Sequence, residues 1–166
     1  MSYNLDVKKM TSDDWSLNNC KERAIYLITN YSKTEKQLRD KLKSSKKYTD
    51  DVIDSTIKFL KKHNFINDLD YAKRYIELHK DQYSKNVLKQ KLYIKGVDKK
   101  IIDEAIDDEK NYDDEGLIKK LLLKKYPEYY DKAPEMDIKE KQKILSYFYR
   151  KGFPYEKIID VMNSNL

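Results

Sequence analysis

Apolar residues recur along this chain at the spacing of α-helices. Positions i, i+3, i+4 and i+7 lie on one face of a helix, and a helical protein turns that face toward its core. The first third of the chain carries three such stripes and therefore predicts three short helices. The stripes are Ala24, Leu27, Ile28 and Tyr31; Leu38 and Leu42; and Ile53, Thr56, Ile57 and Leu60.

Polar residues suited to helix N-caps stand before these stripes. Ser32 and Glu35 have the spacing of a capping box for the second helix. Thr49, which two aspartates follow, is the predicted N-cap of the third helix. That helix is predicted to end near residues 63–65, where the sequence reads HNF.

The order of stripes returns 48 residues later, counted between the alanines that open the first two rounds, and then more loosely a third time. In the third round the first helix should end before Pro127, because the residue before a proline disfavours helical backbone. Residues 127–136 should form a longer connection or lid, and Asp137 with Glu140 should cap the next helix. The later caps and stripes are Asn67 with Ala72, Tyr75, Ile76 and His79; Ser84 with Leu88 and Leu92; Asp98 with Ile101, Ile102, Ala105 and Ile106; and then Ile118, Leu121, Leu122, Ile144, Phe148, Ile158, Val161 and Met162.

Two of the three glycines occupy the same place in the second and third rounds. Gly96 lies four residues after Leu92, and Gly152 lies four residues after Phe148, which are the last positions of the apolar stripes on the two middle helices. A helix C′ residue there needs a positive φ, which glycine adopts without strain. The first-round turn, KSSKKY, has no glycine and one extra residue, so we expect a looser turn there.

These rounds predict an all-α protein of three tandem three-helix repeats. Units of this size bury little apolar surface alone, so we expect them to stack into an elongated, curved solenoid-like molecule. A single irregular helical bundle is the alternative. The predicted division is an N-terminal extension over residues 1–19 and repeats over 20–66, 67–110 and 111–166.

The amino-acid composition favours a folded chain over a disordered one, and the net charge bears on the kind of partner. Hydrophobic and charged residues each make up 39% of the 166, but three glycines, three prolines and fifteen tyrosines argue against disorder. Lys and Arg total 35 against 29 Asp and Glu, a net charge of +6. This excess fits an anionic partner, either nucleic acid or an acidic protein surface, and it equally fits an ordinary solvated surface.

The sequence lacks the common catalytic and phosphate-binding motifs, including GxxxxGK[ST], GxGxxG, HExxH and GxSxG. His63, His79 and Cys20 are best explained by core or capping roles, and the acidic pairs at 50–51, 107–108 and 113–114 by helix capping. We therefore expect no enzymatic activity, no cofactor and no metal site.

The sequence also favours the cytoplasm. It has one cysteine, its first ten residues lack the apolar segment of a signal peptide, and no apolar run approaches the ~20 residues that span a membrane.

Basic residues interleaved with tyrosines are the remaining candidate for function. They gather on the second repeat and recur beside the last inter-helix turn, where they are able to contact phosphates or acidic side chains. A solvated face is the alternative. The predicted contact residues are Arg74, Lys85, Lys89, Lys95, Arg150 and Lys151.

Three stretches resemble the RecX family, the bacterial regulators of RecA recombinase filaments. FINDLDYAKRYIELHKDQYSKNVLKQKLYIKGV, residues 65–97, resembles its central pattern of Asp, then Tyr-Ala, then Leu-x-x-x-Leu and Lys-Gly. TEKQLRDKL (34–42) resembles the first-unit pattern, and YRKGF (149–153) resembles the Arg-Arg-Gly-Phe step of the third. The resemblance extends from about residue 20 to the C-terminus. The chain departs from the family in having only four arginines and no glycine in its first turn.

The resemblance implies three three-helix repeats and a regulatory role. Such a protein binds the RecA nucleoprotein filament in its groove, with DNA of the filament as a further contact, and inhibits ATP hydrolysis, coprotease action and strand exchange. It thereby modulates recombination, DNA repair and the SOS response, and we expect it to be monomeric. Two alternatives are a stand-alone DNA-binding protein with recognition helices and a helical scaffold for another protein.

Overall fold

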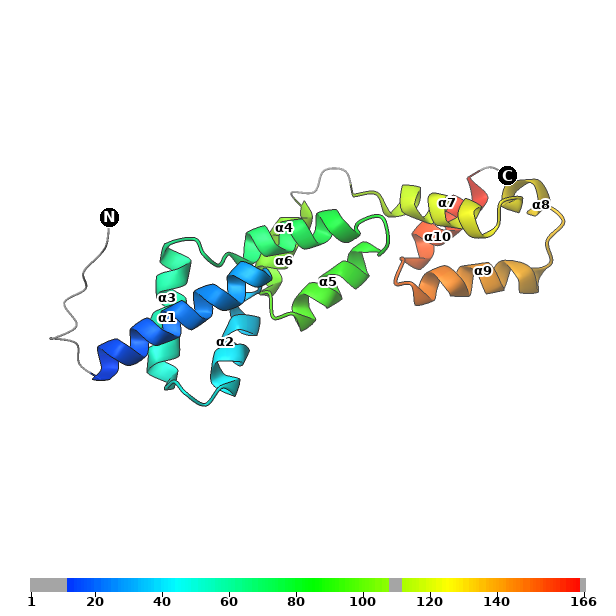
Figure 1. Ribbon diagram of the computed structural model, residues 1–166. Coiled ribbons are helices and arrows are strands. Elements are labelled where there is room, and N and C mark those ends of the chain that lie inside the picture. The colour runs from blue at the N-terminus through cyan, green and yellow to red at the C-terminus, as the bar shows by residue number, and fades with distance from the viewer. Residues whose placement is uncertain (1–11, 108–111, 165–166) are drawn as a thin grey trace. The chain divides into compact units, whose positions relative to one another are not determined.

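A computed structural model describes residues 12–107 and 112–164 (Figure 1). Over these residues the chain forms ten helices and no β-strand, which confirms the predicted all-α class. Residues 1–11 of the predicted N-terminal extension and Asp108 of the predicted acidic pair lie outside the described residues. The helices are α1 (Ser12–Asn30), α2 (Glu35–Ser44), α3 (Asp50–Lys62), α4 (Asp68–His79), α5 (Lys85–Ile94), α6 (Lys99–Asp107), α7 (Asp114–Lys125), α8 (Tyr129–Lys132), α9 (Ile138–Arg150) and α10 (Tyr155–Asn163).

The chain divides into two compact units. The first contains α1–α3, the start of α4 and the turn of residues 95–98. The second contains the rest of α4 together with α5–α10. The α5–α6 turn therefore belongs to the first unit, although the two helices that it connects belong to the second.

Helices α1, α2 and α3 pack pairwise around the core of the first unit. All the predicted positions of the second and third stripes are buried there. In the first stripe Ala24 is buried and the next two positions are half-buried, but Tyr31 is 76% exposed. The prediction for Tyr31 is wrong because α1 ends at Asn30 and the backbone turns away before the next helix.

The predicted capping box at Ser32 and Glu35 is also wrong. Thr34 is the N-cap of α2, where its Oγ1 accepts the Gln37 N–H at 3.1 Å and its own N–H donates to the Gln37 side chain at 3.3 Å. Thr34 has extended backbone and directly precedes the first helical residue, which is the geometry an N-cap requires. Thr49 caps α3 as predicted, and the Asn67 side chain accepts two N–H groups at the start of α4.

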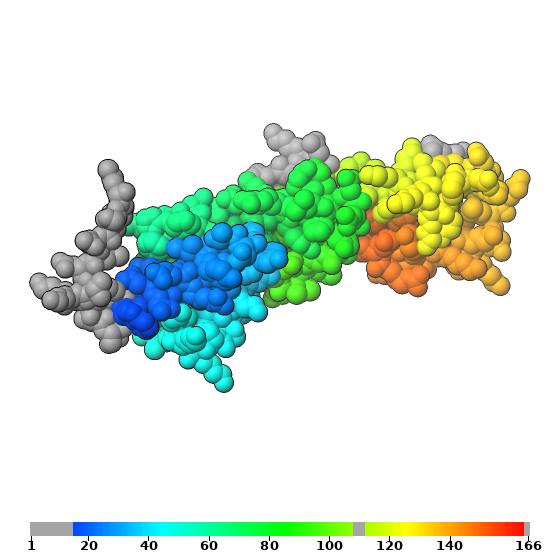
Figure 2. Space-filling view, in the orientation of Figure 1, coloured from blue at the N-terminus to red at the C-terminus, as the bar shows by residue number. Residues whose placement is uncertain are grey.

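The second unit contains the remaining stripes. Its α5 and α6 pack against each other, and α10 packs against both α7 and α9. Every predicted residue of α10 is buried. The buried side chains of α7–α10 form one core cluster. In the space-filling view the yellow surface of the α7 and α8 residues lies beside the orange surface of the residues that follow (Figure 2).

Residues 127–136 do more than connect two helices. They include the short helix α8, whose Tyr129 is 1% exposed and donates a hydrogen bond to the Met162 carbonyl at 3.3 Å. Ala133 is fully buried beside it in the same core. The segment is therefore part of the core that α7, α9 and α10 share, since two of its residues are buried in that core.

The two predicted turn glycines have the expected conformation. Gly96 has φ of 87° and Gly152 has φ of 81°. After α9, the Phe153 N–H bonds to the Phe148 carbonyl at 3.3 Å, which closes the turn as in a Schellman motif. Lys46 occupies the equivalent position after α2 and has φ of 55°. The first turn therefore has a residue with left-handed backbone at this position, although that residue is not glycine.

Candidate interaction surfaces

The first compact unit contains a joint between the start of α2 and the α5–α6 turn. The Thr34 hydroxyl donates to the Lys95 carbonyl at 2.6 Å while it accepts the N–H that caps its own helix. The next N–H, of Glu35, donates to Asp68 Oδ1 at 2.8 Å. Thr34 is fully buried, so this joint excludes water from both hydrogen bonds of the hydroxyl.

The second compact unit repeats the joint with different residues. The Ser84 hydroxyl at the start of α5 donates to the Lys151 carbonyl at 3.1 Å and accepts the Val87 N–H at 3.3 Å. The Lys85 N–H then donates to Asp114 Oδ1 at 3.2 Å. Each joint therefore combines a hydroxyl N-cap, a turn carbonyl and an aspartate at the first position of a later helix.

Both turn glycines also allow a close approach at these joints. A Cβ on Gly96 would lie 2.2 Å from Lys36 Cδ, and a Cβ on Gly152 would lie 2.7 Å from Val87 Cγ2. The glycines thus satisfy two needs at once, a positive φ and room for the preceding middle helix. The sequence indicated the first need and gave no signal of the second.

The two joint aspartates are partly or fully shielded from water: Asp114 is buried and Asp68 is half-buried. Burial raises the pKa of Asp114, although the Lys85 N–H and the nearby Lys157 oppose the shift. Burial likewise raises the pKa of Asp68 against the hydrogen bond from Glu35. The folded protein therefore holds the protons of these groups more tightly than the unfolded chain does.

Replacing Asp114 by asparagine should make the protein gain stability relative to wild type as the pH rises. The wild-type contribution of a carboxyl with a raised pKa is greatest below its ordinary pKa and is lost as the pH rises through the raised value. Asparagine keeps an oxygen for the Lys85 N–H and has no charge to bury. The expected gain is about 1.4 kcal/mol for each unit by which the folded pKa is raised.

Urea unfolding of wild type and Asp114→Asn between pH 3.5 and pH 7 measures this difference. Asp113→Asn is the control, since Asp113 is an exposed neighbour that caps the same helix. A difference between wild type and Asp114→Asn that stays constant over this range would contradict the prediction.

The six predicted contact residues are not equally available. Lys89 forms an ion pair with Asp103 at 2.6 Å, and the ammonium groups of Lys85 and Lys151 lie over tyrosine rings at 5.3 and 5.2 Å. Lys95 is half-buried and its carbonyl belongs to the first joint. The second unit contains the predicted residues other than Lys95, which belongs to the first unit.

Arg74 and Arg150 are the most available of the six. Both are exposed, and neither makes an ion pair with any described residue. The sequence prediction missed two cations near Arg150 on the exposed side of α9, Lys139 and Lys143, which are also without an ion pair in the described part of the chain. Their spacing of i, i+4 and i+11 is the signal that would have found this cationic stripe.

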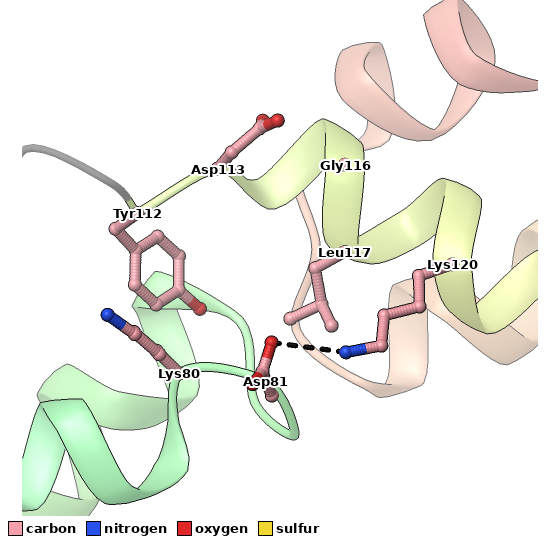
Figure 3. A pocket seen from close by; sticks show the side chains of 7 residues that line it. All are labelled: Lys80, Asp81, Tyr112, Asp113, Gly116, Leu117 and Lys120. Carbon is pink, nitrogen blue, oxygen red and sulfur yellow. Dashed lines mark hydrogen bonds and ion pairs between the residues drawn. The ribbon is translucent and has the colours of Figure 1, made fainter.

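A hollow of about 190 Å³ lies in the second unit between the α4–α5 loop and the start of α7 (Figure 3). Asp81 and Lys120 pair across it at 3.3 Å, and Figure 3 shows Asp113 pointing away from them. The hollow is smaller than typical small-molecule sites. It does not present a free acid and base to a substrate.

Within residues 12–107 and 112–164, no cluster of three or more His, Cys, Asp or Glu side chains has the geometry of a metal site. Cys20 is fully buried, and burial raises the pKa of its thiol. No described helix is long and apolar enough to cross a membrane.

Comparison with known protein families divides the chain into three successive domains. Three family models match the chain: RecX, first three-helix domain, at residues 20–60; RecX, second three-helix domain, at 67–106; and RecX, third three-helix domain, at 113–162. The regulatory protein RecX of Clostridium botulinum (strain Eklund 17B / Type B) is 33% identical over 97% of this chain and 75% of its own length. That of Clostridioides difficile (strain 630) is 31% identical over 98% of this chain and 76% of its length.

Two solved structures share the fold. The crystal structure of RecX from Lactobacillus salivarius matches with a TM-score of 0.74 and 22% identity, covering 90% of this chain and 96% of that one. A second, titled crystal structure of regulatory protein RecX, matches with a TM-score of 0.72 and 20% identity, covering 92% and 79%.

The fold and the joints define a helical-repeat protein made of three three-helix domains in tandem. The chain belongs to the RecX family of regulatory proteins. This confirms the family resemblance and the three-domain fold that the sequence indicated.

Proposed function

We propose that this protein binds the nucleoprotein filament of the RecA recombinase and inhibits its ATP hydrolysis, coprotease action and strand exchange. It does so in the cytoplasm as a monomer, without a cofactor or catalysis of its own. Its membership of a family of regulatory proteins is the observation that carries this proposal. Recombination, DNA repair and the SOS response are the processes it would modulate.

Binding alone is sufficient for inhibition in this mechanism. A filament presents the same surface at each protomer, and three tandem domains offer related surfaces that can engage more than one protomer. A ligand that binds one conformation of the filament more tightly shifts the population toward it. Protomers held in that state no longer pass through the changes that accompany ATP hydrolysis.

A titration of the protein into RecA on single-stranded DNA, with ATP hydrolysis as the readout, tests the proposal. We expect hydrolysis to fall as the protein saturates the filament. Unchanged hydrolysis at saturating protein would overturn the proposed function.

The contact surface is proposed to be cationic. The candidates remain Arg74, Lys85, Lys89, Lys95, Arg150 and Lys151. Among them Arg74 and Arg150 are favoured, because neither is held in an ion pair by another described residue. Arginine also offers a planar group that can pair with a carboxylate or phosphate through two hydrogen bonds. The stripe of Lys139 and Lys143 extends the surface along α9.

Reversing two charges, in Arg74→Glu/Arg150→Glu, should raise the protein concentration needed for half-inhibition about tenfold, because ~1.4 kcal/mol of binding free energy is lost. Lys58→Glu/Lys62→Glu is the matched control, since it reverses two exposed charges on α3 that lie outside the predicted set. If the filament is inhibited equally by wild type and by Arg74→Glu/Arg150→Glu, the contact assignment fails while the function stands.

A stand-alone DNA-binding protein is the alternative function, and the cationic stripe of α9 is the observation that favours it. Such a protein would bind DNA without RecA, with an affinity that falls steeply as salt concentration rises. Binding of this kind together with an unchanged RecA ATPase would favour the alternative.

A further inference from the structure

In the first domain, two ion pairs join the middle helix α2 to the third helix α3 along one edge. Arg39 pairs with Asp54, and one turn further along α2 Lys43 pairs with Asp50 at 2.8 Å. Arg39 directly follows the first buried residue of α2, and Asp54 directly follows the first buried residue of α3. The buried stripes therefore define the equivalent positions in the other two domains.

The inner ion pair is kept in the second domain and lost in the third. At the equivalent positions α5 has Lys89 and α6 has Asp103, and these side chains pair at 2.6 Å. In the third domain α9 has Leu145 and α10 has Ile159, and both are half-buried. Both members of the pair are thus apolar in the third domain, where α9 and α10 pack against each other as α2 and α3 do.

The outer ion pair is replaced in the same way. Lys43 directly follows the last buried residue of α2, and Asp50 is the first residue of α3. The equivalent residues of the third domain are Tyr149 and Tyr155, which are 63% and 55% exposed. Ile138 lies on the same side of α9 as Tyr149, three turns before it, and is 75% exposed. These residues form the apolar edge of the third domain: Ile138, Leu145, Tyr149, Tyr155 and Ile159.

Charged rows of opposite sign border the apolar edge. Lys139 and Lys143 lie on α9, and Glu156 and Asp160 lie on α10. At about 100° per residue, each row lies beside the apolar residues of its own helix, on the side turned away from the core. All four side chains are exposed, and none makes an ion pair with a described residue. The charges on both borders are therefore available to a partner.

We propose that the apolar edge is a docking site for an amphipathic helix of a partner protein. Such a helix has an apolar stripe between two polar sides, which matches the edge and its two borders. Carboxylates on one side of the partner helix meet the lysines of α9, and cations on its other side meet the carboxylates of α10. Nucleic acid does not fit the edge, because the carboxylates of α10 would repel its phosphates. The proposal goes beyond the contact with RecA, since it identifies the partner by the pattern of its helix.

Two synthetic helical peptides of about 18 residues test the charge pattern. Both have leucines along one stripe. The mixed peptide has glutamates on one side of the stripe and lysines on the other, and the acidic peptide has glutamates on both sides. Fluorescence anisotropy of each labelled peptide, titrated with the full chain, measures the dissociation constant. We expect wild type to bind the mixed peptide at least about tenfold more tightly than the acidic peptide, and Glu156→Lys/Asp160→Lys to reverse this preference.

Tyr149→Lys/Tyr155→Asp tests the apolar edge, because it gives the third domain the ion pair that the first domain has at these positions. Both tyrosines are exposed, so the variant should keep the circular dichroism of wild type. The mixed peptide should bind this variant at least about tenfold more weakly than wild type. Lys43→Ala/Asp50→Ala is the matched control, since it removes the equivalent pair from the first domain and should leave the affinity unchanged.

The proposal is overturned if wild type at about 1 mM does not bind the mixed peptide. Equal affinity of wild type and Tyr149→Lys/Tyr155→Asp for this peptide would overturn it as well. A third contrary result is binding of a single-stranded oligonucleotide that the same variant abolishes and the mixed peptide does not displace. That result would assign the edge to nucleic acid.

Discussion

Phe148→Ala should lower the free energy of unfolding of the second compact unit by about 3–5 kcal/mol. The Phe148 ring is fully buried in the core that α7, α9 and α10 share. It also meets the Phe153 ring at 5.9 Å in an edge-to-face contact. Alanine would remove both the buried area and this contact, and the surrounding helices cannot close the cavity completely.

Urea unfolding followed by circular dichroism measures the loss, and hydrogen exchange locates it to α7–α10. Tyr149→Ala is the matched control, because Tyr149 is the next residue of the same helix and is 63% exposed. That substitution should change stability by less than ~0.5 kcal/mol. Equal effects of the two truncations would show that α9 does not bury the face described above.

Gly152→Ala should destabilise the same unit by about 2–4 kcal/mol. An L-residue in left-handed backbone is strained by about 1–2 kcal/mol, and φ at this position is 81°. The added Cβ would also lie 2.7 Å from Val87 Cγ2 and 2.9 Å from Ser84 Oγ, so α5 would have to move. Overpacking of this kind typically costs a further 1–3 kcal/mol.

The opposite substitution at the equivalent position provides the comparison. Lys46→Gly relieves the left-handed strain at φ of 55° in an exposed turn, so we expect a gain of about 1 kcal/mol. Both variants are measured by urea unfolding at one pH. A destabilised Lys46→Gly, or a Gly152→Ala as stable as wild type, would contradict the account of these turns.

The helices, most of their caps and the repeat were predictable because their signals are local. A stripe such as Ile53, Thr56 and Ile57 is set by the 3.6-residue period of one helix. A cap such as Asp137 with Glu140 involves residues three apart. The wrong prediction at Ser32 is of the same kind, since two hydroxyl residues stood near one helix start and Thr34 had the extended backbone next to it.

The site was less predictable than the fold. The sequence identified basic residues but could not show that Lys89 is paired with Asp103, whereas Arg74 and Arg150 make no ion pair within the described residues. An ion pair between two helices forms only if those helices pack together. The charge pattern of each helix does not determine which helices pack. Lys139 and Lys143 were visible in the sequence, yet their exposure follows from how α9 packs.

By itself the sequence determined three rounds of three helices, their buried stripes and two turns that need glycine. Those features arise from interactions within one or two helical turns. Only the tertiary structure decided the joints, in which Glu35 meets Asp68 and Ser84 meets Lys151 across 33 and 67 residues of chain. No periodicity marks such pairs, because chain packing and not local backbone preference brings a hydroxyl, a carbonyl and a carboxylate to one place.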